Sequence, residues 1–470
     1  MSKISSMLDI GKRSLSNSQT ALQTVSHNIA NKTTEGFSRQ RVEILTNPPP
    51  SPGQVQVGTG ARAGMITRTN NPWLEKQIQR EGTSLGYSNA RSEALTRVEQ
   101  VYNEQENKGL NQYMTDFFNG FREMSANPES LAGRSMVREA AVALTGDFKR
   151  VVGQLKDVQE DLDHQITATV DEVNQATKEI ADLNMKIKLV EAQGVPSNDE
   201  RDRRDLLLKK LGEKLEVNWA EGADGMVSVT AGRAAVLVSG IDSTDLKSHK
   251  VGEKSGTQIF YSTTKNGTEF NITDHLRGGR VGASLEVRDE VIEGLKNHAD
   301  NLAYNFAKEV NEAHVEGYDR YGKTGTEFFQ MPDQVDGAAE KLSINQDIFS
   351  DVGRIAAAAR PDAPGDNTVS NMISSLQHQK LMSDGAATFD DYYNAEVGQV
   401  GSVTNRAVKT MESQKNIMQQ LGNLRESISG VSLDEETTKM IEFQKAYDAS
   451  ARLIRTADEM FDTILNLKRL

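Results

Sequence analysis

The two ends of the chain carry matching heptad patterns, and this symmetry limits the fold more than any other feature. Near the N-terminus, apolar or small residues recur in a four-three alternation, which puts them on one seam of a helix. These residues are Ile4, Leu8, Gly11, Leu15, Ser18, Leu22, Val25 and Ile29. The C-terminal segment repeats the alternation at Met440, Phe443, Tyr447, Ser450, Ile454, Ala457, Phe461 and Ile464. The pattern predicts two terminal helices that pair antiparallel, with Leu15 near Ile454 and Ser18 near Ser450.

Helical periodicity also fills much of the chain between these ends. It resumes near Trp73, with breaks expected at Gly86 and Gly109, and its longest stretch runs from about residue 135 to residue 190. Helical patterns return after residue 285 and again from residue 367 almost to the C-terminus. The chain is therefore predicted to be mainly α-helical.

Two regions carry the pattern of strands instead. Residues 213–284 alternate apolar and polar side chains between Gly and Asp turns, which is typical of short strands. Val42, Ile44 and the alternating residues 54–69 also predict extended chain. The longer of these regions is expected to form a small β-rich insertion that projects from the helices.

These patterns predict an elongated, mainly α fold with a β-rich insertion and four parts that are discontinuous in sequence. The expected parts are a terminal antiparallel coiled coil (1–35 and 431–470), a helical bundle (36–212, 285–316 and 367–430), a β-rich outer domain (213–284), and a region of loops and short strands (317–366). Because the two ends pair along their length, later segments should lie progressively farther from the terminal stalk.

Composition and charge exclude several classes of function. The net charge of −13 at pH 7 argues against general nucleic-acid binding, which needs basic patches that displace counterions. The chain has no cysteine, which excludes disulfides, thiol catalysis and cysteine-based zinc sites. No run of about twenty apolar residues is present, so no membrane insertion is predicted. Asp9 and Lys12 interrupt the stretch in which a cleavable signal would need its apolar core.

The terminal seams are wider than a single helix pair requires. Leu453, Met460 and Leu467 lie off the main C-terminal seam and widen its apolar face, so more neighbours are expected. We hypothesise that the terminal helices become ordered when many copies pack side by side. The net charges of the two ends are opposite in sign, which supports this hypothesis. Residues 1–46 hold six basic and three acidic side chains, whereas residues 434–470 hold six basic and eight acidic ones. From periodicity alone, the alternative is an intramolecular stalk that never polymerises.

Three local patterns look chemical but have simpler interpretations. Residues 317–324 match the P-loop consensus, yet an amphipathic helix precedes them and no helical pattern follows, so no nucleotide site or other cofactor is predicted. The seven histidines form no His-x-x-x-His pair with an intervening glutamate, and no metal site is predicted. The mixed-charge run 199–205 is interpreted as a solvated helix face with intrahelical ion pairs, with a clasp between subunits as the alternative.

A resemblance to a known family rests on the end of the first helix. The run from Ser26 to Phe37, S-H-N-I-A-N-K-T-T-E-G-F, resembles the signature shared by the axial proteins of the bacterial flagellum. The residues that carry it, together with the three that follow, are Asn28, Ala30, Asn31, Thr34, Gly36, Phe37, Ser38, Arg39 and Gln40. The Ser38-Arg39-Gln40 run is similar to the hook-associated branch of that family more than to hook or rod proteins. Residues 198–208, 311–329, 429–436, 443–447 and 465–467 are similar to the same branch.

This resemblance implies a structural, non-enzymatic subunit of the zone between hook and filament, which assembles into a ring or short tube through its terminal heptad residues. The implied partners are further copies of the chain, the hook protein, the filament-side hook-associated junction protein, and a cytoplasmic export chaperone at residues 434–470. It also implies secretion to the flagellum through the type III export apparatus, without a cleaved signal peptide. Another axial protein, either the hook protein or the filament-side junction protein, is the alternative. A coiled-coil adhesin or scaffold would leave the signature unexplained.

Overall fold

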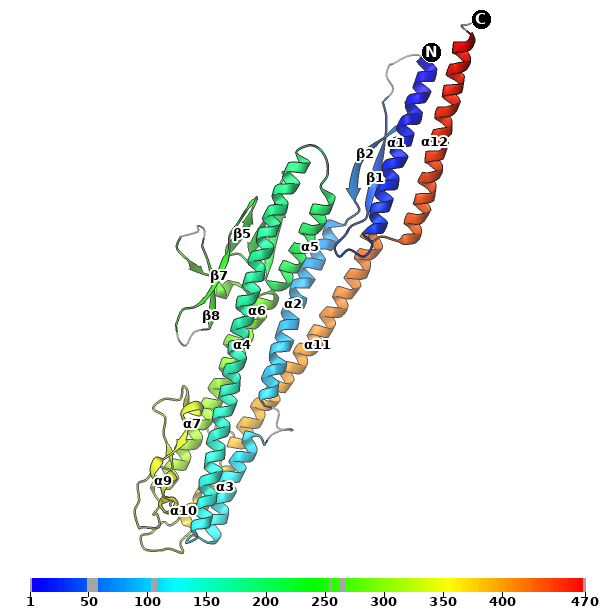
Figure 1. Ribbon diagram of the computed structural model, residues 1–470. Helices are drawn as coiled ribbons and strands as arrows, with labels where there is room; N and C mark the ends of the chain where they lie inside the picture. Colours follow the sequence, from blue (N-terminus) through cyan, green and yellow to red (C-terminus); the bar gives the residue numbers. More distant parts are fainter. Residues whose placement is uncertain (1, 49–57, 103–107, 253–255, 263–266, 468–470) are drawn as a thin grey trace.

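The paired ends predicted from the heptads form one tip of a long rod. The computed structural model describes residues 2–48, 58–102, 108–252, 256–262 and 267–467. Helix α1 (Ser2–Ala30) runs antiparallel to helix α12 (Leu433–Leu467), and both described ends of the chain lie at that tip (Figure 1). The remaining elements extend away from the pair, as the sequence predicted.

The register of this pair differs from the predicted one by one helical turn. The Ser450 hydroxyl donates to Ser14 Oγ at 2.7 Å, and Gly11 lies directly against Ile454. The predicted pairings of Ser18 with Ser450 and of Leu15 with Ile454 are therefore wrong. A shift of four residues is about one turn and returns the same seam to the interface, so heptad periodicity defines the face but not the axial register.

A β-hairpin packs along the other side of α1. Strand β1 (Gln40–Thr46) pairs antiparallel with strand β2 (Ala61–Arg68), and Asn17 of α1 binds the backbone of β2 at Ala61 and Ala63. In Figure 1 the hairpin and α12 lie on opposite sides of α1. The extended chain expected here is confirmed for the described residues 58–69, while residues 54–57 lie outside the described part. The hairpin, which the sequence grouped with the helical bundle, accompanies the terminal pair.

Four helices make the shaft of the rod. They are α2 (Pro72–Val101), α4 (Leu131–Glu191), α5 (Asn198–Lys214) and α11 (Phe389–Ser429), with α2 running beside α11 (Figure 1). The long helix expected near residues 135–190 is confirmed as α4. The break expected at Gly86 is wrong, because α2 continues through it. A side chain at Gly86 would collide with the backbone of Glu213, so this glycine permits close helix packing rather than a turn.

The β-rich insertion forms two small antiparallel sheets beside the middle of α4. The first has the order β3 (Val217–Glu221), β4 (Val227–Ala231), β5 (Ala235–Ser239), β6 (Asp242–Ser243). The second has the order β7 (Leu246–Lys250), β8 (Thr257–Tyr261), β9 (Phe270–Asn271). Buried side chains of the sheets join those of α4 and α5 in one core. The short helices η1 (Thr273–His275) and α6 (Gly279–Glu286) follow, so the expected strand region ends in helix.

The end of the rod far from the termini is built around phenylalanines. Helices α3 (Leu110–Ala126), α7 (Glu293–Val315) and α10 (Thr368–Ser375) surround them with the start of α4, and the π-helix η2 (Val287–Ile292) leads into α7. The fully buried rings belong to Phe117, Phe118, Phe121, Phe148, Phe306, Phe328, Phe329 and Phe389. Residues 317–366 hold β10 (Phe329–Gln330), β11 (Ser343–Ile344), α8 (Ala338–Lys341), α9 (Gln346–Ser350) and η3 (Val352–Arg354), and η4 (Leu376–His378) follows α10.

The segment that matches the P-loop consensus turns its amides inward. The Asp319 carboxylate accepts hydrogen bonds from the backbone amides of Tyr321, at 2.7 Å, and of Lys323, at 2.8 Å. These amides hold an acidic side chain in the place where a P-loop would hold phosphate. The loop is a local turn that closes onto the distal core.

His314 sits in that core as a neutral hydrogen-bonded ring. It is 1% exposed, its Nδ1 donates to the Thr326 carbonyl at 2.7 Å, and its Nε2 accepts from the Ala356 amide at 2.8 Å. Burial lowers the pKa of His314 to about 4, and the nearby charge of Arg134 acts in the same sense. A proton on Nε2 would remove an acceptor that the Ala356 amide needs.

We predict that this histidine makes stability depend on pH. Between about pH 6.5 and about pH 4 the unfolded chain binds a proton that the folded chain excludes, so stability falls as pH falls. The contribution is about 1.4 kcal/mol per pH unit, and about 3 kcal/mol over the whole window. The measurement is urea unfolding, followed by circular dichroism, of the wild type and the His314→Gln variant from pH 7 to pH 4. The difference between their unfolding free energies should shrink as pH falls, and a constant difference would contradict the assignment.

Candidate assembly site at the joint of the terminal helices

The signature residues leave α1 through a tight turn that leads the chain back to the shaft. Asn31 Nδ2 donates to the His27 carbonyl at 3.0 Å, which satisfies the end of α1. Gly36 then takes a φ of +83°, in the left-handed region that favours glycine, with Leu206 of α5 packed beside it. Residues 31–39 therefore connect α1 to β1, and the signature forms a joint between two parts of the rod.

Asn28 is the central residue of this joint. Its side chain is 1% exposed, its Nδ2 donates to the Gln40 carbonyl and to Glu436 Oε2, both at 2.9 Å, and its Oδ1 accepts from the Gln40 amide at 3.0 Å. One buried amide thus joins the end of α1, the start of β1 and the start of α12.

Arg39 neutralises the glutamate that Asn28 contacts. Glu436 is 1% exposed, and its Oε1 accepts from Arg39 Nε at 2.8 Å. The same guanidinium lies 2.8 Å from Glu435, and the Arg39 backbone amide donates to the Ser429 carbonyl at 2.9 Å. A buried carboxylate is stable only when paired and hydrogen-bonded, so Arg39 and Asn28 together allow Glu436 to be buried.

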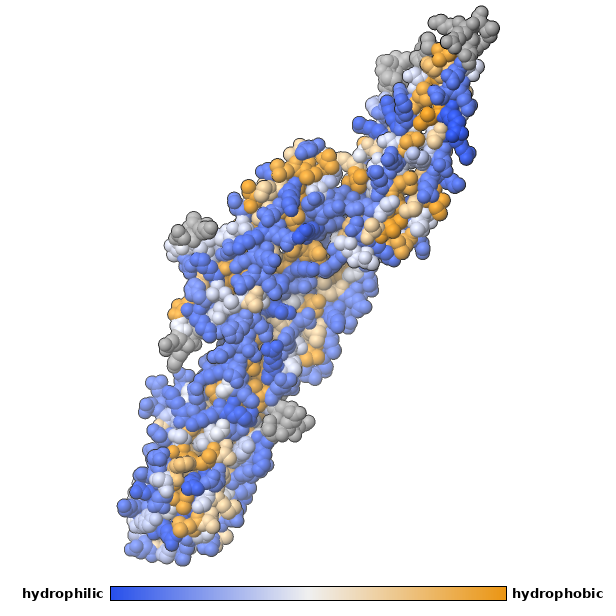
Figure 2. Space-filling view, viewed as in Figure 1, coloured by the Kyte–Doolittle hydropathy of each residue, from blue (hydrophilic) through white to orange (hydrophobic). Residues whose placement is uncertain are grey.

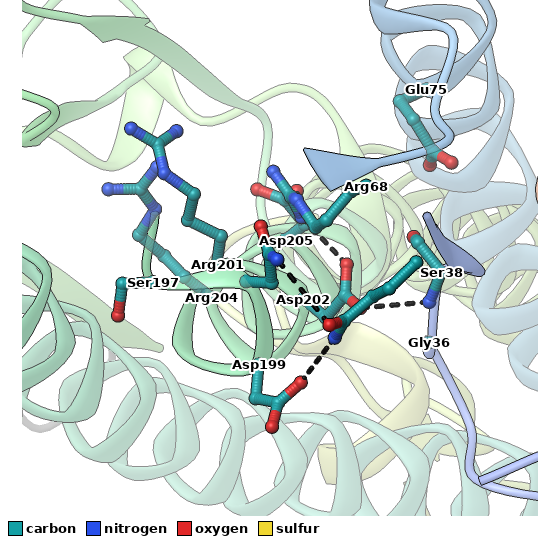
Figure 3. A network of polar contacts seen from close by, with 12 residues as sticks. Gly36, Ser38, Arg68, Glu75, Ser197, Asp199, Arg201, Asp202, Arg204 and Asp205 are labelled. Atoms are coloured by element: carbon teal, nitrogen blue, oxygen red, sulfur yellow. Dashed lines mark hydrogen bonds and ion pairs between the residues drawn. The ribbon is translucent and has the colours of Figure 1, made fainter. Parts of the chain in front are cut away.

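The next layer of the joint is an ion-pair cluster on α5. The Asp202 carboxylate accepts from the Ser38 amide at 2.8 Å and from Arg68 at 2.7 Å, and Asp205 accepts from the same Arg68 nitrogen at 2.9 Å. Figure 3 shows Asp202 and Asp205 on the side of α5 that faces Ser38 and Arg68. Asp199 of the same helix accepts from Gln40 Nε2 at 2.7 Å.

Burial acts on this ion pair in two ways. It raises the pKa of Asp202, although Arg68 and the Ser38 amide oppose the change. It would lower the pKa of Arg68, but Asp205 and Asp202 outweigh it, and the pKa of the guanidinium is raised. Arg68 therefore stays protonated, and removing it would leave Asp202 buried and unpaired, a loss that typically costs about 3 to 5 kcal/mol.

The opposite side of α5 carries the basic residues of the same charge run. Arg204 is 1% exposed and donates to the Gly225 carbonyl at 2.6 Å and to Asn184 at 3.1 Å, and Arg201 pairs with Glu191 and Glu221 at 2.6 Å each. In Figure 3 these two arginines point away from the joint. The prediction of a solvated face with intrahelical pairs is therefore wrong. The partners are distant segments, because acidic and basic residues fall on opposite sides of the helix.

Arg425 fastens the joint to the shaft. This residue near the end of α11 pairs with Glu75 of α2 at 2.7 Å and donates to the Gly36 carbonyl at 3.1 Å. Its side chain is mostly buried. The turn of the signature is therefore held from α5 on one side and from α11 on the other.

The structure brings most of the signature together and adds partners that the sequence did not reveal. Thr34 donates to Asn31 at 3.1 Å, and the Phe37 ring meets His27 edge to face, whereas Ala30 is exposed. Arg68 and Arg425 were missed, whereas Asp202 and Glu436 were singled out only within the charge run 199–205 and the family-like segment 429–436, without these partners. A useful signal was the i, i+3 spacing of Asp199, Asp202 and Asp205, which puts three carboxylates on one helix face.

The heptad residues lie along the α1–α12 contact with different degrees of burial. Val25 is fully buried, whereas Ile4, Leu8, Leu15, Leu22, Ile29, Met440, Phe443, Ile454 and Phe461 are partly buried. Tyr447 and Ile464 remain 37% and 41% exposed. The fully buried centre of the contact is formed mostly by small residues, namely Gly11, Ser18, Ala21, Ser450 and Ala457.

Other kinds of site were sought in the described part of the chain. No group of three or more His, Asp or Glu side chains there could hold a metal ion. No described helix combines the length and the apolar character needed to cross a membrane. A cleft of about 610 Å³ beside the joint is lined by both acidic and basic residues, among them Arg68, Glu75 and Arg201.

Comparison with known proteins places the chain in a family. A family model described as the flagellar hook-associated protein FlgK helical domain matches residues 95–329, half of the chain. The chain belongs to the FlgK family. A second model, described as the C-terminal part of the flagellar basal body rod protein FlgEFG, matches residues 425–467, which span the end of α11 and helix α12. The predicted resemblance is confirmed.

Individual relatives match nearly the whole chain. Flagellar hook-associated protein 1 of Bacillus subtilis (strain 168) is 29% identical, over 98% of this chain and 97% of that protein. The protein of the same name from Escherichia coli (strain K12) is 24% identical, over 99% of this chain and 100% of that protein. The solved flagellar hook junction protein FlgK from Burkholderia pseudomallei has a TM-score of 0.67 at 15% identity and covers 75% of this chain and all of that chain. This likeness shows the same fold.

We predict that Asn28→Asp opens the joint. The new carboxylate would face Glu436 across 2.9 Å in a buried site, and a buried like-charge pair should cost about 3 kcal/mol or more. Limited proteolysis should then cleave the turn at residues 31–38 at least about tenfold faster than in the wild type, because cleavage follows local opening.

The matched control is Asn301→Asp, the same change on the exposed side of α7. It should leave the cleavage rate at the turn unchanged. Equal cleavage of the turn in Asn28→Asp and in the wild type would show that the buried amide does not hold the joint closed.

Proposed function

We propose that this chain is a structural subunit of the zone between the flagellar hook and the filament, and that it assembles with further copies through its terminal helices. The observation that carries the proposal is the composition of the α1–α12 contact. Its buried centre is made mostly of small residues such as Ala21 and Ala457, which bring the two helices close together. The larger apolar side chains are thereby left at the flanks, where neighbours can cover them.

Helix α12 bears the greatest share of these uncovered side chains. Its large apolar residues that are 37% to 57% exposed are Leu433, Ile441, Tyr447, Leu453, Met460, Ile464 and Leu465. Among them, Leu453, Met460 and Ile464 follow the i, i+7, i+11 spacing that puts them on one flank of the helix, and an exposed apolar stripe on a soluble protein usually marks an interaction site. An intramolecular stalk that never polymerises would gain nothing from it.

The names of the relatives support the location and the neighbours. Two relatives are named hook-associated proteins, and the solved structure is titled a hook junction protein. We infer that the hook protein is one neighbour and that the filament-side hook-associated junction protein is the other. The half-chain match to the FlgK domain supports this assignment over the alternative that the chain is itself the hook protein or the filament-side protein.

We infer a purely structural role without a catalytic step. The charged residues of the joint pair with one another and with backbone groups, as Arg39 does with Glu436 and Arg68 with Asp202. Such closed ion pairs hold segments in place and leave no group free to act as a general acid or base. The perturbed pKa values in the joint therefore have a structural cause.

Export before assembly is part of the proposal. The chain would leave the cytoplasm through the flagellar type III apparatus without a cleaved signal peptide, and a chaperone would hold residues 434–470 until then. The apolar surface of α12 supports this, because an uncovered helix of this kind would associate prematurely in the cytoplasm.

We predict that Leu22→Asp or Ile454→Asp abolishes assembly and spares the shaft. Each change puts a charge into the α1–α12 contact, where both residues are partly buried. Sedimentation of polymers should fall below about a tenth of the wild-type amount, while circular dichroism and amide exchange of residues 110–430 stay unchanged. Leu131→Asp, at an exposed position on the far end of the rod, is the control that should assemble normally. If the shaft lost its protection from amide exchange together with the termini, the idea that the shaft folds independently of the terminal pair would be refuted.

We also predict that deletion of residues 434–470 abolishes binding of the export chaperone. The segment contains nearly all of α12, and the apolar side chains that a chaperone would cover go with it. Calorimetry with the purified chaperone should show no binding to the truncated chain. Deletion of residues 1–30 is the control, because it exposes the same face of α12 and should preserve binding. Binding retained without residues 434–470 would move the chaperone site elsewhere.

A further inference from the structure

The buried apolar side chains of the shaft form two large clusters that do not merge. In helix α4, Leu162 belongs to the distal cluster, whereas Ile166, about one turn later, belongs to the cluster of the β-rich insertion. The chain that runs back along α4 divides at the same level, between Leu285 of α6 and Val287 of η2. Helix α4 passes through both regions without a break (Figure 1). The shaft therefore has a β-rich half and a distal half, which meet at a boundary between these residues.

The boundary is a polar layer built around Asp163 of α4 and Arg288 of η2. These residues are only 6% and 4% exposed, and Asp163 Oδ1 accepts from Arg288 Nη1 at 2.7 Å. The same pair holds the start of β8, because the Thr257 amide donates to Asp163 at 2.9 Å and the Thr257 carbonyl accepts from Arg288 at 2.7 Å. On the face shown in Figure 2, mostly hydrophilic side chains cover this middle part of the rod. One buried ion pair thus joins α4, η2 and β8.

Further contacts fix the position of Arg288. Its Nε and Nη2 donate to Asp289 at 2.7 Å and 2.8 Å, and its carbonyl accepts from Gln159 Nε2 at 3.0 Å. The backbone packs against the guanidinium at Gly256, where a Cβ atom would lie 2.6 Å from Arg288 Cζ. Burial alone would raise the pKa of Asp163, but hydrogen bonds from the strand and from Arg288 outweigh it, and the pKa is lowered. The pair therefore stays ionised.

The helix that crosses the polar layer beside α4 changes its winding there. Helices α6, η2 and α7 follow one another without a gap, and residues 287–292 of this segment are a π-helix. Leu285, Ile292 and Phe306 are spaced by 7 and 14 residues, so an unbroken α-helix would point all three to one side. A π turn accommodates one extra residue and rotates the following helix by about 100°. Helix α6 therefore packs on α2 and α5, whereas α7 packs on α10 and α11.

We propose that the polar layer is a latch that sets the angle between the two halves of the shaft, with Arg288 as the positioning residue and the π turn as the flexible element. Helices α2 and α4 contact elements of both halves, so the halves can bend relative to each other but cannot separate. A buried ion pair contributes little net stability, because the desolvation of two charges offsets much of their attraction. The polar layer therefore binds the halves less firmly than apolar packing binds each half, and its main effect is on their orientation.

A lysine in place of Arg288 would not form this latch. The guanidinium binds three groups at once, in Asp163, Thr257 and Asp289, through a rigid planar fork. A lysine keeps the positive charge, but its single ammonium group on a flexible stem cannot reach all three acceptors from one position. Arg288→Lys should therefore keep the shaft folded and leave the angle between its halves poorly defined.

Distances between spin labels test the latch, because the chain has no cysteine of its own. A spanning pair of labels, at Val236→Cys in β5 and Asn301→Cys in α7, lies on exposed positions of the two halves. An internal pair, at Glu123→Cys in α3 and Asn301→Cys, lies within the distal half. Both pairs are measured by double electron–electron resonance in the native background, in Arg288→Lys, and after deletion of Glu290, which removes the extra residue of the π turn.

In the native background the spanning pair should give one narrow distance distribution. Arg288→Lys should widen it at least about twofold, and deletion of Glu290 should shift its mean by more than the native width, because α7 turns by about 100°. The internal pair should not change in either variant. The matched control is Lys178→Met, which breaks an exposed ion pair with Asp245 inside the β-rich half and should leave both distributions unchanged.

An unchanged spanning distribution in both Arg288→Lys and the Glu290 deletion would overturn the latch, as would a broad distribution in the native background. If the internal pair changed as well, the polar layer would be holding the distal core together rather than setting its angle, and the proposal would also be overturned. Every measurement uses the unassembled chain, so none of these outcomes bears on the proposed function.

Discussion

One buried amide holds together parts of the chain that are farthest apart in sequence. Asn28 and Glu436 are separated by 408 positions, yet their side chains are hydrogen-bonded in a site that excludes water. An unmatched polar group in such a place would cost about 1 to 3 kcal/mol, and an unpaired charge would cost more. The joint is therefore stable only when α1, β1 and α12 are all in place. A few side chains of the joint therefore fix the direction of the terminal pair relative to the shaft.

Helix α5 transmits that constraint to the rest of the rod. Its acidic side holds the turn of the signature through Ser38 and Arg68, and its basic side holds α4 and the first sheet through Arg201 and Arg204. Neither set of partners lies on α5 itself. The acidic residues of the helix bind partners on one side and its basic residues bind partners on the other. The same short helix therefore positions both the terminal unit and the β-rich insertion.

The terminal pair follows a different rule, in which size matters more than charge. Small residues at the centre of the contact let α1 and α12 approach closely, so most of the larger apolar side chains are only partly buried between them. They lie at the edges of the pair and on the outer face of α12. The small residues that bring α1 and α12 together thereby leave the larger apolar side chains available to neighbouring copies. The fold of one copy is in this way linked to the assembly of many.

The sequence by itself determined the elements that depend on periodicity. The heptads of the two ends predicted antiparallel terminal helices, the long apolar stripe predicted α4, and the alternation after residue 213 predicted the sheets, because each pattern reports which face of an element is buried. The residues of the signature also indicated where the joint lies. Only the tertiary structure decided the register of α1 against α12, because a shift of one turn returns the same face. It also decided the partners of Asp202, Arg204 and Glu436, since nothing local in the chain records which distant charge will meet them.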